Sequence, residues 1–201
     1  MSAGTHVLVV GYGNVLRGDD GVGQEVAEAI WLQRDRLPGL ARARVIWVTQ
    51  LTPELALDVS DAGLAVFVDA ACDGRPVGSV SVEVLPGPSV EPADKCGAEP
   101  GGPAVVAEGG RLSSGAGCWQ DVSAAGLLRL AAELFGRAPV GVMVTVSVAC
   151  TGAGEGLSPL VSAAVPRAVA AVRMAIAASL RRDGGARPLS GARPAAGGRG
   201  A

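Results

Sequence analysis

Aspartates stand directly after two apolar segments of the chain, and they are the residues best suited to chemistry. Asp19 and Asp20 follow the apolar run Val7–Val10 and a glycine-containing turn, and Asp69 ends the apolar run 64–68. Short apolar runs without polar alternation are typical of strands buried on both faces. Parallel strands end at one edge of a sheet and lie about 4.8 Å apart, so carboxylates on neighbouring strands can share a cation or a proton.

Each of these acids also has a purely structural interpretation. Asp19 or Asp20 would cap the helix that follows, because an aspartate before a helix often accepts hydrogen bonds from its first turn. Asp69 would accept hydrogen bonds from loop N–H groups at the end of its strand. The placement of both positions at one predicted sheet edge favours a functional role.

The glycines of this first turn do not match a dinucleotide-binding motif. After Gly11 and Gly13 the pattern G-x-G-x-x-G requires a glycine at position 16, where the chain has Leu16. The two acids before the helix would also repel a pyrophosphate. A dinucleotide-binding oxidoreductase is therefore the least favoured of the functions considered below.

The only histidine, His6, precedes the first predicted strand. A strand from His6 to Gly11 spans on the order of 16 Å, so the imidazole lies at the end opposite the aspartates. This placement excludes a Ser-His-Asp or Cys-His arrangement at the acidic edge. We expect His6 on the surface.

Composition restricts the class of protein. The chain has 201 residues, 49% of them apolar and 18% charged, with a net charge of −2. This length suits one domain, and the charge gives no reason to expect binding to nucleic acid or to an anionic membrane. We find no apolar run long enough to span a membrane and no signal-peptide pattern, so we expect a cytoplasmic protein. The four cysteines form no C-x-x-C pair, which disfavours structural zinc.

Strand and helix patterns alternate along the chain and predict a three-layer α/β sandwich. Its five-stranded, mostly parallel sheet has helices on both faces. The segment 80–85 alternates apolar and polar residues, so we expect one antiparallel edge strand there. Residues 1–182 are predicted to form a single domain with a long loop at 86–119, and residues 183–201 a disordered tail. The predicted strands are 7–10, 45–48, 64–68, 80–85 and 140–149, and the predicted helices are 22–36, 53–60, one capped by Ser123 and ended by Gly136, and a last one from 158 in which Pro166 forms a kink or break.

The segment 11–23, GYGNVLRGDDGVG, resembles the opening signature of the nickel–iron hydrogenase maturation endopeptidases. Three further blocks follow in the same order as in that family: QLTPELA at 50–56, VFVDA at 66–70 and GEGLSP at 154–159. Together these blocks cover most of residues 7–180 in register, apart from the predicted loop. A single G-x-G-N would mean little, whereas four ordered blocks are a specific signal.

The resemblance implies a hydrolase of the aspartyl-type, metal-dependent endopeptidase class that lacks a conventional triad. Members of the family remove a short C-terminal extension from the large-subunit precursor of a [NiFe] hydrogenase after nickel insertion, and the nickel carried by the substrate is thought to be recognised. The second acid of the opening motif and the aspartate ending the third strand belong to the family's metal site. These positions map onto Asp20 and Asp69, the predicted catalytic residues.

The third metal ligand of the family is a histidine, and this chain departs from the family there. The equivalent position falls on Gln120 or, less favourably, on Asp121, and a glutamine oxygen is poorly matched to nickel. Three explanations remain open. Asp20 and Asp69 act with the substrate's own nickel ligands, or Cys118 or Asp121 replaces the histidine, or the chain binds a precursor without cutting it.

Two main functional hypotheses follow. In the first, the chain is a processing endopeptidase whose predicted metal residues are Asp20, Asp69 and Gln120. Cleavage would then proceed through a metal-polarised carbonyl or a metal-activated water. In the second, the chain is a catalytically impaired paralogue of the same fold that binds the hydrogenase precursor. The sequence does not determine the oligomeric state, and we expect a monomer.

Overall fold

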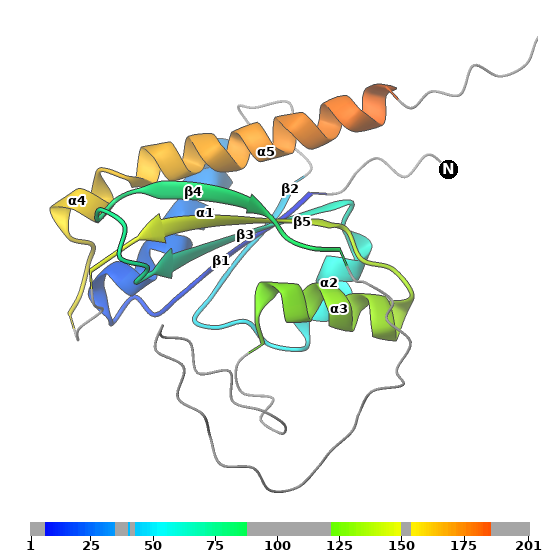
Figure 1. Cartoon of the computed structure of the whole chain (residues 1–201), viewed down its shortest axis with the longest axis horizontal. Coiled ribbons are helices and arrows are strands. Elements are labelled where there is room, and N and C mark those ends of the chain that lie inside the picture. The colour runs from blue at the N-terminus through cyan, green and yellow to red at the C-terminus, as the bar shows by residue number, and fades with distance from the viewer. Residues whose placement is uncertain (1–6, 35–39, 41–42, 88–121, 150–153, 186–201) are drawn as a thin grey trace, which may run out of the picture.

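The computed structural model describes residues 7–34, 40, 43–87, 122–149 and 154–185, and the side chains up to 181. Helices and strands alternate along most of this length (Figure 1). In chain order the elements are β1 (Val7–Tyr12), the 3-10 helix η1 (Gly18–Gly21), α1 (Val22–Gln33), β2 (Ala43–Val48), α2 (Leu55–Asp61), β3 (Leu64–Ala71), β4 (Val80–Val84), α3 (Ala124–Phe135), β5 (Val140–Ser147), α4 (Pro159–Ser162) and α5 (Val165–Gly185).

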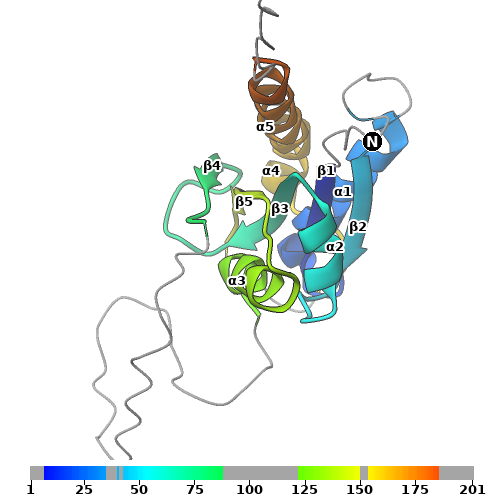
Figure 2. The ribbon, with the colours of Figure 1, turned by 90° about the vertical axis from the view of Figure 1, so that its right-hand side faces the viewer.

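The five strands form one sheet in the order β2-β1-β3-β5-β4. Neighbours pair in parallel except for β4, which lies antiparallel to β5 at an edge. Viewed along the strands, the sheet separates α5 on one side from α2 and α3 on the other (Figure 2). This arrangement confirms the predicted α/β sandwich with its antiparallel edge strand.

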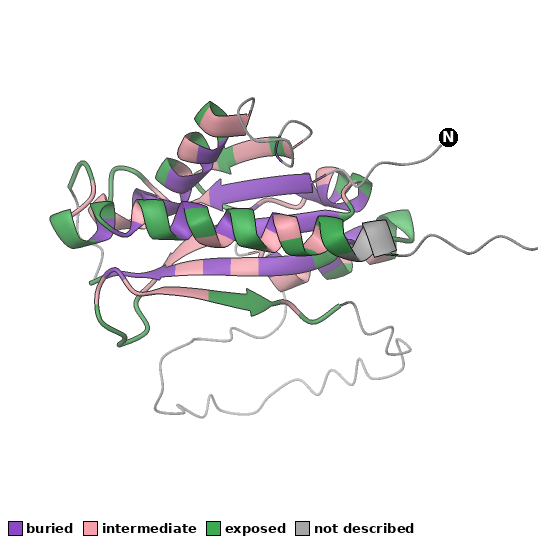
Figure 3. Ribbon diagram, turned by 90° about the horizontal axis from the view of Figure 1, so that it is seen from above, coloured by how far each residue is buried: buried purple, intermediate pink, exposed green. Residues whose placement is uncertain are grey.

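Side chains of the strands alternate between two apolar cores. Val9, Val66 and Val144 pack with α1 and α5, whereas Leu8 and Phe67 pack with α2 and α3. All of these side chains are buried, and the buried ribbon of the central strands contrasts with the exposed β4 (Figure 3). Because both faces of the central strands are covered, their sequences are continuously apolar, which made them recognisable.

Several predicted helix boundaries are confirmed, and each depends on interactions between residues close in sequence. The Ser123 hydroxyl accepts a hydrogen bond from the Gly126 N–H at 3.0 Å and caps α3, and Gly136 ends this helix with a φ of 70°. Pro166 occupies the first turn of α5, and the chain breaks between α4 and α5 just before it, as predicted. The helix α5 continues to Gly185, so the first three residues of the predicted tail are helical. The remaining tail and the loop from residue 88 to 121 lie outside the described residues.

Three predicted details are wrong. Neither Asp19 nor Asp20 caps α1, which begins at Val22 after η1 and has no side-chain cap. The helix α2 begins at Leu55 and not at 53, because residues 53 and 54 form a turn in which the N–H groups of Leu55 and Ala56 donate to the carbonyls of Thr52 and Pro53. In this turn a hydrogen bond from the Thr52 hydroxyl, together with a backbone hydrogen bond within Glu54, lowers the pKa of the Glu54 carboxyl. The strand β3 continues to Ala71, so Asp69 lies within it.

The last helical stretch is more apolar than predicted. Residues Pro159–Arg181 have a mean hydropathy of 1.6 over an 18-residue window, which by length and composition is enough to cross a membrane. The expectation that no such stretch exists is therefore wrong. In the fold, however, this stretch buries Val172 and Ile176 against the sheet, and core helices of soluble proteins pass the same test.

Candidate functional site

The first turn of α1 packs directly on the backbone of β1 and β3. A Cβ atom on Gly11 would lie 2.0 Å from the Gly23 carbonyl oxygen. A Cβ atom on Gly23 would lie 2.3 Å from the Tyr12 carbonyl oxygen and 2.5 Å from that of Val68. The glycines of the opening segment therefore permit a close approach of helix and sheet. This approach brings the connection between β1 and α1 against the carboxyl end of β3, which η1 contacts.

Asp20 is held by the turn that precedes it. Its Oδ2 atom accepts a hydrogen bond from the Asn14 N–H at 2.8 Å, and its side chain is half-buried. Gly13 makes this turn possible, because its φ is 130° and a Cβ there would lie 1.9 Å from the Asp20 carbonyl oxygen. The Gln24 amide further fixes the turn by donating to the Gly13 carbonyl at 2.6 Å. The carboxylate of Asp20 is thus fixed at the carboxyl end of β1.

Asp19 points to a different partner. Its two carboxylate oxygens accept hydrogen bonds from the N–H and the hydroxyl of Ser158, the residue before α4. The neighbouring backbone reinforces this contact, since Gly18 donates to the Gly154 carbonyl at 2.7 Å. Asp19 is therefore a structural residue, and of the adjacent acids only Asp20 stays available as a site residue.

Asp69 lies on the β3 face that packs toward α2 and α3, two residues after Phe67 on the same face. Its Oδ1 atom accepts a hydrogen bond from the Ala70 N–H at 2.8 Å. The half-buried side chain lines a cleft of about 770 Å³ at the carboxyl end of β3.

The cleft exists because α3 covers only part of the sheet. Within the helix, Leu128 packs so closely on β5 that a Cβ on Gly141 would lie 2.4 Å from it. The helix starts at Ala124, and beyond this point no other described element covers the polar side chains on the same face of the sheet. The residues lining the cleft are Tyr12, Asp69, Ala70, Ala71, Cys72, Asp73, Arg75, Ser81, Glu83, Leu85, Pro86, Ser123, Ala124, Ala125, Met143 and Thr145.

Charges in this cleft are mainly acidic. Asp69, Asp73 and Glu83 line it together with one cationic side chain among the described residues, Arg75. Arg75 donates to the Asp73 carboxylate through Nε at 2.8 Å and also through a terminal nitrogen. The Arg75 hydrogen bonds, aided by the Ser147 hydroxyl at 2.9 Å, lower the pKa of Asp73 to about 2. The pair is therefore charged at neutral pH.

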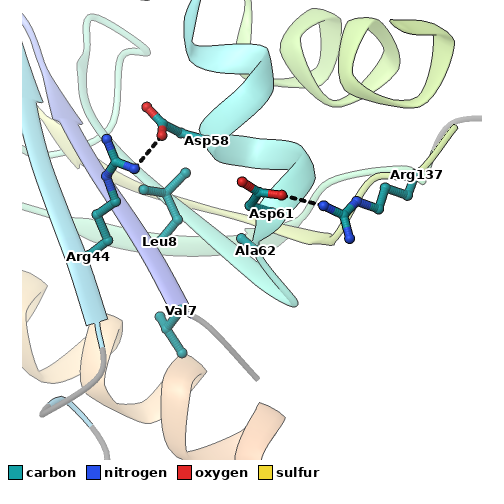
Figure 4. Close-up of a pocket in the computed structure, with 7 residues that line it drawn as sticks. All are labelled: Val7, Leu8, Arg44, Asp58, Asp61, Ala62 and Arg137. Carbon is teal, nitrogen blue, oxygen red and sulfur yellow. Dashed lines mark hydrogen bonds and ion pairs between the residues drawn. The ribbon is translucent and has the colours of Figure 1, made fainter. Parts of the chain in front are cut away.

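A second cavity, of about 440 Å³, lies at the opposite end of the sheet (Figure 4). Its floor includes Leu8, and two ion pairs stand around it: Arg44 binds Asp58 at 2.5 Å, and Arg137 binds Asp61. The second pair is exposed, so it adds little stability. No predicted site residue is among the residues that line this cavity.

Solved structures share this architecture. HycI, a [NiFe] hydrogenase maturation protease from Thermococcus kodakarensis, superposes with a TM-score of 0.56 at 21% identity over 88% of this chain and 95% of its own. The hydrogenase maturating endopeptidase HybD from E. coli gives 0.59 at 19% identity, covering 90% and 94%. A hydrogenase 2 maturation peptidase from a Thaumarchaeota archaeon gives 0.53 at 24% identity, covering 86% and 98%. The chain has the hydrogenase maturation protease fold. No protein-family model and no curated protein sequence matches it.

In this hydrogenase maturation protease fold the predicted acids end up on segments that touch each other. Asp20 belongs to η1, which contacts β3, and Asp69 belongs to β3 itself. Only Asp69 is among the residues that line the cleft. Their joint action on one cation stays a prediction. The positions predicted or considered for the third ligand, Gln120, Asp121 and Cys118, lie outside the described residues, as does His6.

The described donors do not form a resident nickel centre. Within residues 7–34, 40, 43–87, 122–149 and 154–185, no group of three His, Cys, Asp or Glu side chains is placed to hold a metal ion. The two predicted carboxylates are hard oxygen ligands, which suit magnesium or manganese better than nickel.

Sequence reasoning missed the polar floor of the cleft. Thr145 lies in the most apolar strand of the chain, and Ser81 lies in the edge strand, so neither residue stood out. A usable signal was present in β5, where every second residue from 142 to 146 is valine while positions 141, 143, 145 and 147 read Gly, Met, Thr and Ser. One face of this strand becomes polar toward its carboxyl end.

Proposed function

We propose that the chain is a cytoplasmic endopeptidase that removes the C-terminal extension from a nickel-loaded [NiFe] hydrogenase large-subunit precursor. The observation that carries this proposal is the position of Asp20 and Asp69, on adjacent segments at the carboxyl ends of the neighbouring strands β1 and β3. The chain shares its fold with proteins described as hydrogenase maturation proteases. The four ordered sequence blocks point to the same activity.

In this proposal the two carboxylates have different tasks. Asp69 borders an open cleft of about 770 Å³, large enough for a peptide segment, and so it faces the substrate. Asp20 is fixed by Asn14 and Gly13 beside this edge, where its negative charge attracts the cation that the precursor brings. Preorganised carboxylates of this kind need no rearrangement when the substrate binds.

A direct assay tests the proposal. The purified chain is incubated with nickel-loaded precursor, and the mass of the large subunit is followed over time. We expect trimming by the wild type and its loss in Asp20→Asn and Asp69→Asn. Asp61→Asn is the matched control, because the same change is made at an exposed carboxylate at the opposite end of the sheet. Unchanged trimming by either site variant would refute the assigned roles.

A second candidate function is a precursor-binding protein that does not cut. It is favoured by the lack, within the described part of the chain, of a three-residue metal-ligating group. The same assay separates the two functions. A wild-type chain that co-purifies with the nickel-loaded precursor and leaves its mass unchanged supports binding alone, whereas trimming by the purified wild type eliminates it.

A further inference from the structure

Four polar side chains stand in a row across the carboxyl edge of the sheet, one from each of four adjacent strands. Asp69 of β3 is the register partner of Thr145 of β5, which in turn is the register partner of Ser81 of β4. Tyr12 of β1 extends the row. Gly11 is the register partner of Val68, and Tyr12 and Asp69 are the next residues along these two parallel strands. All four side chains line the cleft. We call this set, Tyr12, Asp69, Thr145 and Ser81, the polar row.

The hydroxyls of Thr145 and Ser81 have no structural task among the described residues. Neither hydroxyl forms a hydrogen bond with another described side chain or backbone group, and both residues are half-buried. No buried side-chain nitrogen or oxygen in the described part of the chain lacks a partner, so these two hydroxyls are not buried, and both residues line the cleft. Ser147, the next residue on the same face of β5, differs because it is buried and binds Asp73.

The spacing of the row suits an extended polypeptide. Adjacent strands lie about 4.8 Å apart, so four strands span about 14 Å, the length of about four extended residues. A hydroxyl both donates and accepts, so Thr145 and Ser81 can bind the N–H and C=O groups of a peptide backbone whatever its side chains are. A ligand bound along this row would place its backbone directly beside Asp69.

We propose that Thr145 and Ser81 are substrate-positioning residues that bind the backbone of the precursor segment entering the cleft. This inference rests on the proposed endopeptidase function and adds to it the surface that holds the substrate peptide. Thr145 is the more important of the two, because it is the register partner of Asp69, whereas Ser81 is one strand further away.

Steady-state trimming of the nickel-loaded precursor tests the assignment. Thr145→Val removes the hydroxyl at constant shape, and we expect KM to rise about 3- to 10-fold with kcat within about twofold, as for the loss of one uniform binding contact. Thr145→Ser keeps the hydroxyl and should restore KM. Ser81→Ala should raise KM less, and Ser162→Ala, the same change at an exposed residue of α4 outside the cleft, should leave it unchanged.

Several outcomes overturn the assignment. One is an unchanged KM in both Thr145→Val and Ser81→Ala, and another is a Thr145→Ser variant as impaired as Thr145→Val. Melting temperatures within about 2 °C of the wild type establish that the variants are folded. If the wild type trims and the variants trim equally well, this inference fails while the proposed function stands.

A wild type that does not trim would instead refute the proposed function. Binding then decides the inference separately, using a fluorescent synthetic peptide that spans the extension and the residues before it. Weaker binding by Thr145→Val than by the wild type and Thr145→Ser supports the assignment. Equal binding by all three proteins, or no binding to the wild type, overturns it.

Discussion

Asp19 accepts two hydrogen bonds from Ser158, from its N–H at 2.6 Å and from its hydroxyl at 2.9 Å, although the two residues are 139 positions apart. The contact ties η1 to the segment before α4, next to a backbone hydrogen bond from Gly154 to the Leu16 carbonyl at 3.1 Å. The adjacent acids of the opening segment are therefore divided between two tasks. Asp19 stabilises the edge of the sheet, and Asp20 is left for the candidate site.

Replacing Asp19 by alanine should destabilise the fold. Two hydrogen bonds to a half-buried carboxylate are lost, and we expect the free energy of unfolding to fall by about 1.5–3 kcal/mol. Asp19→Asn should cost less, because the amide oxygen still accepts one hydrogen bond. Urea titration followed by circular dichroism measures the effect. Asp61→Ala, which removes only an exposed ion pair, should change stability by less than about 1 kcal/mol, and an equal loss in both variants would contradict this role.

Replacing Gly23 by alanine should be far more disruptive. The new methyl group would lie 2.3 Å and 2.5 Å from the carbonyl oxygens of Tyr12 and Val68, and rigid backbone cannot yield without moving α1 off the sheet. We expect a loss of about 3 kcal/mol or more, visible as a lower melting temperature. Gly154→Ala is the control, since nothing lies within 4 Å of its added carbon. Equal melting temperatures of the two variants would show that the close packing at Gly23 does not contribute to stability.

Local signals made much of the fold predictable. The central strands are apolar on both faces, and the alternation at 80–85 marked the edge strand now assigned as β4. Ser123 and Gly136 marked the ends of α3 because capping depends on residues a few positions away. Pro166 marked the break between α4 and α5 for the same reason. Each of these features depends on residues that are only a few positions apart in the sequence.

Other features depend on contacts between distant segments and could not be predicted from local patterns. Local patterns did not distinguish Asp19 from Asp20, and only the family resemblance selected Asp20, because their different partners, Ser158 and Asn14, are set by the tertiary fold. Thr145 is inconspicuous within an apolar strand, and only the register that aligns it with Asp69 and Ser81 reveals the polar row. Both features lie at the carboxyl edge of the sheet, where segments distant in the sequence meet.

The Asp73–Arg75 pair leads to a prediction about pH. Hydrogen bonds from Arg75 hold the pKa of Asp73 at about 2, below its ordinary value of 3.8. A depressed pKa in the folded state means that the pair stabilises the fold above pH 4, and that this contribution is lost as the pH falls from about 4 through about 2. A carboxyl-carbon NMR titration should show Asp73 still ionised at about pH 3. Arg75→Gln should move its midpoint up toward 3.8, whereas the exposed control Arg173→Gln should not.

The helix α5 offers a test of whether its apolar stretch serves the core. Val172 is fully buried against the sheet, whereas Met174, two residues later on the opposite face, is 71% exposed. Val172→Asp would bury an unpaired charge and should cost about 3 kcal/mol or more, while Met174→Asp should change stability by less than about 0.5 kcal/mol. Thermal unfolding measures both. Equal losses of stability in the two variants would mean that α5 uses its apolar surface outside the domain. The same conclusion would follow if the wild-type chain sediments with lipid vesicles and the Met174→Asp variant does not.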